Sequence, residues 1–252
     1  MNVDVKAQAV RLRELHHSEE MLVLPNVWDA ASAEVIAEAG FPVIATTSAA
    51  IADMLGYPDG EGAPWPEMFA AAGRVARAVA VPVTVDAEAG YGLPPGELVD
   101  RLLEIGVVGC NLEDTDHRAG GLVDAGSHAE YLAAVRTAAD AAGIPIVINA
   151  RVDTYLRGAV SEADRLTEAI RRGRRYVEAG ADCVYPIGVG DERHIATLVA
   201  EVPGPINANT RPDALDLAKL RALGVSRVSY GPRFYRRALA DLKAAVHNEL
   251  LI

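Results

Sequence analysis

Carboxylic acids stand where two apolar runs of the sequence end. Asp86 and Glu88 follow the run VPVTV, and Glu113 follows the run VVGCNL. Asp86 and Glu88 are two residues apart, so they face the same side of an extended chain. A buried carboxylate is costly unless it is paired or bound to a metal. Three oxygen donors without neighbouring His or Cys ligands favour a hard cation such as Mg²⁺ or Mn²⁺, with water completing its shell.

Any one of these acids could instead form a salt bridge with an arginine such as Arg151. For the three acids together, metal binding is the favoured interpretation. In a parallel barrel, polar residues at the carboxyl ends of the strands mark the functional face. Other polar residues in such positions are Asn26, Asp29, Thr46, Thr47, Ser48, Asp114, Asn149, Arg151, Asp153, Asn207, Asn209, Tyr230 and Arg233.

The elements that must position these residues alternate along the chain. Short β-branched runs are followed by Ala-rich amphipathic stretches, a pattern typical of parallel βα units. Eight such pairs in 252 residues favour a single-domain (β/α)8 barrel of the TIM type over residues 1–252, rather than an open doubly wound sheet. An extra N-terminal helix over 5–15 is expected to cover the lower end of the barrel. Strands are predicted at 21–24, 42–46, 82–86, 109–113, 145–150, 183–186, 205–209 and 227–229, and helices at 30–39, 66–80, 95–105, 128–142, 162–179, 192–201, 214–223 and 232–250.

Composition limits the kinds of partner. The formal net charge is −11, which argues against nucleic acid or an anionic membrane as the main partner. No run of 18 or more apolar residues and no apolar signal core occur, so we expect a soluble cytoplasmic protein. Cys110 and Cys183 lie in apolar runs and are interpreted as small buried hydrophobes, because a disulfide framework or a zinc site needs more cysteines at closer spacing.

Six motifs resemble those of the isocitrate lyase/phosphoenolpyruvate mutase superfamily, in the same order across nearly the whole chain. The run DAEAGYG resembles the metal-binding strand end of that superfamily, and LED in the next strand resembles its partner carboxylate. PNVWDAASA resembles the opening strand and turn. TTSAAIADMLGYPD resembles the segment after the second strand. INARVDTY resembles the fifth strand, and PINANT resembles the seventh.

This resemblance implies a role for each matching residue. Asp86 would be the direct ligand of Mg²⁺, and Asp59, Glu88 and Glu113 would hold water molecules bound to the ion. The ion would act as a Lewis acid that stabilises an enolate. The residues implied in substrate binding are Arg151, which would clamp a carboxylate, Thr46, Thr47 and Ser48, with backbone N–H donors around the latter two, and Asn209, which would contact the far end.

The chain departs from the superfamily in the loop over residues 115–128. The lyases carry a Lys-Lys/Arg-Cys-Gly-His run there, whereas this chain reads TDHRAGGLVDAGSH, without Lys or Cys. Isocitrate or methylisocitrate lyase activity by the usual route is therefore disfavoured, and the Lys and Asn of the phosphonomutase loop are also missing. His117 becomes the candidate proton donor and Arg118 a candidate anion contact. Ile187 replaces a glutamate of the lyases, which predicts a more apolar distal pocket.

The prediction is thus a Mg²⁺-dependent lyase or phosphonomutase-like enzyme. It would cleave or form a C–C or P–C bond in a small 2-oxo or 2-hydroxy carboxylate or phosphonate through an enolate. Two alternatives stay open: a C–C hydrolase of the oxaloacetate type, and a family member that binds a carboxylate without turnover. Relatives exchange the last helix between subunits, so residues 232–250 could form a homodimer or homotetramer, or could pack on their own barrel.

Overall fold

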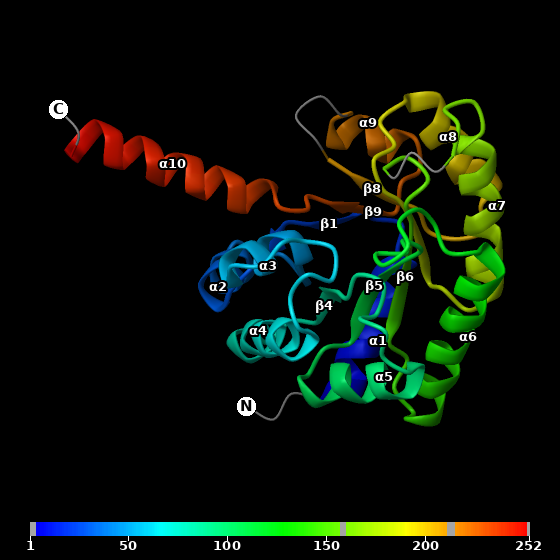
Figure 1. Cartoon of the computed structure of the whole chain (residues 1–252), viewed down its shortest axis with the longest axis horizontal. Coiled ribbons are helices and arrows are strands. Elements are labelled where there is room, and N and C mark those ends of the chain that lie inside the picture. The colour runs from blue at the N-terminus through cyan, green and yellow to red at the C-terminus, as the bar shows by residue number, and fades with distance from the viewer. Residues whose placement is uncertain (1–3, 157–159, 211–214, 251–252) are drawn as a thin grey trace.

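Parallel strands form a closed barrel, seen in Figure 1 for the computed structural model, in which residues 4–156, 160–210 and 215–250 are described. Strands β2 to β7 pair in chain order, and β1, β9 and β8 form a second row. Pro25 alone separates β1 from β2, and it lacks the N–H that a ladder requires. A parallel bridge between Val184 and Ile206 joins the rows and confirms the predicted barrel. The strands are β1 (Leu22–Leu24), β2 (Asn26–Val27), β3 (Ile44–Thr46), β4 (Val83–Asp86), β5 (Gly109–Glu113), β6 (Val147–Val152), β7 (Cys183–Pro186), β8 (Asn207–Asn209) and β9 (Arg227–Ser229).

Helices surround the barrel as the alternation predicts, with one addition. Helix α3 (Ser48–Leu55) begins directly after β3 and was not predicted as a helix. Two other helices differ at their starts: α6 begins at Ala125 instead of 128, and α7 at Arg165 instead of 162. The described part of the next-to-last predicted helix begins at Leu217, and residue 214 lies outside the described residues. The helices other than α3 are α1 (Val5–His16), α2 (Ala30–Glu38), α4 (Trp65–Ala78), α5 (Pro95–Glu104), α6 (Ala125–Ala141), α7 (Arg165–Glu178), α8 (Glu192–Glu201), α9 (Leu217–Ala222) and α10 (Arg233–Leu250).

Helix α1 closes the lower end of the barrel, as expected. Leu12 is fully buried in a cluster with Leu24, Val108 and Val147. Gly109 makes this closure possible, because a Cβ at that position would lie 2.7 Å from Leu12 Cδ2. The upper end is thereby left as the open face. Separately, Cys110 and Cys183 are both buried and free, as the sequence predicted.

The buried His128 of α6 makes stability depend on pH. Its ring packs edge-on against Tyr176, and burial followed by the nearby Arg172 lowers its pKa from 6.5 to about 4. The unfolded chain therefore takes up this proton at a higher pH than the folded chain, and folding loses stability as the pH falls from 6.5 to about 4. We expect His128→Phe to escape this loss. Urea unfolding across that range should favour the variant progressively, by up to about 3 kcal/mol; parallel stability curves would contradict the expectation.

Helix α10 leaves the barrel and extends away from it in Figure 1. None of its described residues is buried, and its large apolar side chains are exposed. The alternative in which this helix packs along its own barrel is therefore wrong, while exchange between subunits stays a prediction. No described helix combines the length and apolar character needed to cross a membrane. The exposed apolar residues of α10 are Phe234, Leu239, Leu242, Val246 and Leu250.

Candidate active site

The strand register sets two layers of polar residues at the upper end of the barrel. In the lower layer Asp86 pairs with Asn111, and Asn111 pairs with Asn149. In the upper layer Glu113 pairs with Arg151. Glu113 therefore lies one layer above Asp86 and not directly beside it. The neighbour of Glu113 on β4's side is Glu88, whose carbonyl accepts the Glu113 N–H at 2.8 Å.

Asp86 meets the first residue of α3. Its Oδ2 atom accepts hydrogen bonds from Ser48 Oγ at 2.8 Å and from the Ser48 N–H at 3.2 Å. Ser48 Oγ also lies 3.2 Å from Asp59 Oδ1, so this serine joins the two carboxylates. The N-terminal end of a helix favours negative charge, which explains why α3 starts here. Asp86 Oδ1 is buried and has no hydrogen-bond partner among the described residues.

Glu88 belongs to a cluster of residues with unusual backbone geometry. Glu61, Glu88 and Tyr91 have φ values of 59°, 49° and 55°, in the left-handed region that side chains other than glycine seldom adopt. The three are joined to one another: Tyr91 Oη donates to Glu88 Oε1 at 2.7 Å, the Tyr91 N–H donates to Glu61, and the Glu61 N–H donates to Glu88. Burial raises the pKa of Glu88 to about 7. Strain of this kind persists where the surroundings hold it, commonly at functional sites.

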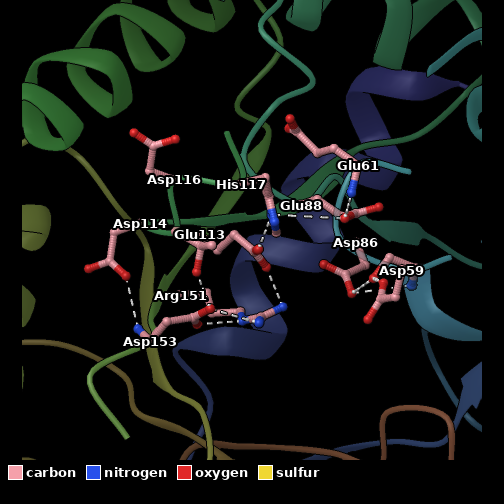
Figure 2. A network of polar contacts seen from close by, with 12 residues as sticks. Asp59, Glu61, Asp86, Glu88, Glu113, Asp114, Asp116, His117, Arg151 and Asp153 are labelled. Carbon is pink, nitrogen blue, oxygen red and sulfur yellow. Dashed lines mark hydrogen bonds and ion pairs between the residues drawn. The ribbon is translucent and has the colours of Figure 1, made fainter. Parts of the chain in front are cut away.

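Glu113 and Arg151 form the centre of a buried ionic network, drawn in Figure 2. Glu113 contacts an Nη atom of Arg151 and lies 2.7 Å from His117 Nε2. Arg151 also binds Asp153 in a bidentate manner, at 2.7 and 2.8 Å. Burial raises the pKa of Glu113, and the hydrogen bond to Glu113 raises the pKa of His117. The guanidinium is thus held rigidly in place before any substrate arrives.

A cavity of about 300 Å³ opens above this framework. Asp59 and Asp86 line one side of it, and Asn111 and Arg151 line the interior. Leu156, Tyr185 and Ile187 add a partly apolar wall, in line with the distal pocket that Ile187 predicted. A space of this size suits a small acid. The other lining residues are Asn26, Thr47, Ser48, Ala49, Gly188, Asn209, Ser229, Gly231, Pro232 and Arg236.

The structure separates the predicted site residues into three groups. Six line the cavity, whereas Thr46, Glu88 and Glu113 do not, and Thr46 Oγ1 instead accepts the Asp86 N–H at 3.1 Å. His117 and Arg118 line a second cavity of about 320 Å³, next to Glu61 and Tyr91, so the proton-donor role of His117 stays a prediction. The six that line the main cavity are Thr47, Ser48, Asp59, Asp86, Arg151 and Asn209.

The backbone donors expected at Thr47 and Ser48 are already engaged. The Thr47 N–H donates to the Val27 carbonyl at 3.2 Å, and the Ser48 N–H donates to Asp86. The next residue of α3, Ala49, also lines the cavity, and N–H groups in the first turn of a helix have no partner within the helix. Ala49 is therefore the residue of this turn that lines the cavity and whose N–H has no partner within the helix.

Four polar lining residues escaped sequence reasoning: Asn111, Tyr185, Ser229 and Arg236. Asn111 had a usable signal, because it stands two residues before Glu113 and so points to the same side of the strand. Tyr185 and Ser229 lie within runs that read as plain strands. Arg236 lies inside a helix whose other features indicate only amphipathic packing.

The carboxylates fit a hard divalent cation with a single direct protein ligand. Among the described residues, no three His, Cys, Asp or Glu side chains converge as a ligand set. Asp86 Oδ1, buried and without a partner, is the atom that an ion would satisfy. Asp59 is close enough to share Ser48 with Asp86, and acids at this remove suit contacts through metal-bound water, which Mg²⁺ retains readily.

The fold is a parallel barrel, and its acidic site lies at the carboxyl ends of the strands. The chain belongs to the phosphoenolpyruvate phosphomutase family, whose model matches residues 12–250. It is 37% identical over 235 residues to an uncharacterized protein of Mycobacterium tuberculosis, covering 93% of this chain and 85% of that protein. It is 30% identical over 256 residues to 2,3-dimethylmalate lyase of Eubacterium barkeri, covering 96% and 86%.

Solved structures agree with this assignment. The crystal structure of a candidate phosphonomutase from Burkholderia cenocepacia superposes with a TM-score of 0.89 at 38% identity, covering 95% of this chain and 98% of that one. The wider phosphoenolpyruvate mutase/isocitrate lyase superfamily contains lyases, mutases and hydrolases, and its members are typically Mg²⁺-dependent and bind small carboxylates. The predicted superfamily and fold are therefore confirmed.

Proposed function

We propose that this protein is a Mg²⁺-dependent enzyme that cleaves or forms a C–C or P–C bond in a small 2-oxo or 2-hydroxy acid through an enolate. The observation that carries the proposal is the buried, unpartnered Asp86 Oδ1 beside a cavity that the preorganised Arg151 also lines. A C–C bond is the preferred target, because the loop over 115–128 lacks the Lys and Asn of the phosphonomutases. The relative at 30% identity is also named as a lyase, 2,3-dimethylmalate lyase.

Each group has a distinct task in this proposal. Asp86 would bind Mg²⁺ directly, and Asp59, Glu88 and Glu113 would hold water on it. The bound ion would polarise the substrate's 2-oxygen and stabilise negative charge that develops there. Arg151, fixed by Glu113 and Asp153, orients the substrate carboxylate, and the first turn of α3 directs an N–H toward the same oxygens.

Proton transfer needs a group that reaches the cavity. Tyr185 lines it, and burial raises the pKa of Tyr185, so that the phenol stays neutral and able to donate. His117 stays the second candidate, and it would first have to leave Glu113. If Tyr185 is the donor, the loop over 115–128 can keep its position. If His117 is the donor, the loop has to move so that His117 leaves Glu113.

Product release from a panel of acids tests the proposal. The purified protein is incubated with 2-hydroxy and 2-oxo acids in Mg²⁺, and pyruvate, glyoxylate and oxalate are measured. We expect one of these products to appear with Mg²⁺ and to disappear with EDTA. Oxalate with acetate would identify a hydrolase instead of a lyase. Mg²⁺-dependent ligand binding without any product would identify a binding protein and contradict the proposed catalysis.

A further inference from the structure

Three arginines open helix α10, and among the residues that the structure describes only one of the three finds no partner. Arg233 stacks over the Tyr230 ring, with 5.8 Å from its Cζ to the ring centre. Arg237 binds Asp241 at 2.8 and 2.9 Å. Arg236 has no hydrogen bond or ion pair from its side chain within the described part of the chain, and it lines the cavity that Asp86 and Arg151 line. Its charge is therefore available to a ligand there.

The root of α10 is held in place although the rest of the helix is not. Asn26 Oδ1 accepts the N–H groups of Tyr230 and Gly231 at 2.8 and 2.9 Å, and Asn26 Nδ2 donates to the Thr46 carbonyl at 2.7 Å. One turn into the helix, Tyr235 Oη donates to Asp53 Oδ2 at 2.8 Å, and its ring packs edge-on against Trp28 at 5.3 Å. These contacts hold the residue next to Tyr235, which is Arg236, over the mouth of the barrel.

The charges around the cavity are unevenly distributed. Asp86 ends β4 and Asp59 follows α3, whereas Arg236 lies in α10, which follows β9. The strands β1, β2 and β3 lie between β9 and β4 around the barrel. Arg151 is already paired with two carboxylates, those of Glu113 and Asp153. A divalent ion at Asp86 would offset the acidic side. Arg236 is then the cation of the cavity whose charge no described carboxylate offsets, and it lies on another side of the mouth.

We infer that Arg236 is the residue that recognises the second acidic group of the substrate. This inference rests on the proposed function, in which the first carboxylate and the 2-oxygen lie at the metal. The side chains of Leu156 and Ile187 line the same cavity and accommodate the carbon chain between the two acidic groups. The second group is a carboxylate or a phosphonate, because both form charge-assisted hydrogen bonds with a guanidinium.

Calorimetric titration of the Mg²⁺-loaded protein at fixed ionic strength tests this assignment. The probes are malate and 3-phosphonolactate, which carry two separated acidic groups, 2-hydroxybutyrate, which carries one, and oxalate, whose two carboxylates chelate a single ion. The wild type should bind malate or 3-phosphonolactate about 10- to 100-fold more tightly than 2-hydroxybutyrate, as expected for one charge-assisted contact. Which of the two binds more tightly distinguishes the carboxylate from the phosphonate.

Matched variants distinguish a specific contact of Arg236 from the effect of the other positive charges on the helix. Arg236→Gln should remove the preference for the dianion and leave oxalate affinity unchanged, and Arg236→Lys should restore part of the preference. Arg237→Gln, which removes the neighbouring charge, should behave as the wild type. A dianion preference that survives in Arg236→Gln, or that Arg237→Gln removes equally, would overturn the assignment. Oxalate binding that needs no Mg²⁺ would contradict the proposed function itself, and this outcome is distinct from the first two.

Discussion

Replacing Asp86 by Asn is expected to abolish Mg²⁺-dependent turnover and to weaken Mg²⁺-dependent oxalate binding by more than about a hundredfold. The reason is that Asp86 supplies the buried, unpartnered oxygen of the cavity, and an amide provides no charge for the ion. The fold should survive, because asparagine keeps the shape of the side chain and an oxygen that can accept from Ser48. Calorimetry with oxalate, together with the product assay, measures both effects.

Asp59→Asn is the matched control for the change at Asp86. Asp59 shares Ser48 with Asp86, but it is expected to contact the ion only through water. Its replacement should therefore cost about 10- to 100-fold in affinity, as is typical for outer contacts. An Asp86→Asn protein that binds oxalate and Mg²⁺ like the wild type would contradict the assignment of the metal site. Equal losses in the two variants would show that no single acid dominates.

Replacing Arg172 by Met is expected to destabilise the protein by about 3–5 kcal/mol, because it leaves a carboxylate buried without its counter-charge. Arg172 Nη1 lies 2.9 Å from Asp114 Oδ2, and the side chains of both are almost completely buried. Tyr176 Oη donates to the same carboxylate oxygen at 2.8 Å. The cost should appear in urea unfolding as a lower midpoint with an unchanged slope.

The double variant Asp114→Asn with Arg172→Met provides the control. Removing both charges leaves no unpaired ion, so its loss should be clearly smaller than that of Arg172→Met alone. A double variant as unstable as the single one would mean that lost packing, not charge, sets the cost. Turnover should also fall in Arg172→Met, because Asp114 accepts the Asp153 N–H at 2.9 Å and Asp153 holds Arg151.

The barrel could be predicted from the sequence because its signals are local. Each strand is a short β-branched run, and each helix is periodic over several turns, so the order of elements follows without any knowledge of distant contacts. Helix α3 was missed because it begins at Ser48, with only Thr47 between it and β3, in a segment whose polar residues read as a substrate loop. A barrel unit with two helices gives no signal in the strand–helix alternation itself.

The site was predictable in its residue types and less so in its geometry. Asp86, Glu88, Glu113 and Arg151 were found because strand ends carry function in such barrels. The heights of these residues along the barrel axis could not be predicted, because the register depends on pairing between strands. The buried Arg227 shows the limit most clearly. It lies inside the barrel and is held by Asn111 and His16, each at 3.2 Å, which are 116 and 211 residues away in the chain.

The contacts among Glu61, Glu88 and Tyr91 connect two loops that the chain builds separately. One loop follows α3 and carries Asp59, and the other follows β4 and carries Glu88. Each loop donates a backbone N–H to a carboxylate of the other, from Glu61 to Glu88 and from Tyr91 to Glu61, so each loop helps to hold the shape of the other. In a chimera between this barrel and a relative, residues 56–64 and 87–93 should therefore be exchanged together. A chimera that exchanges only one of them would inherit a mismatched pair, even if every residue of the cavity were retained.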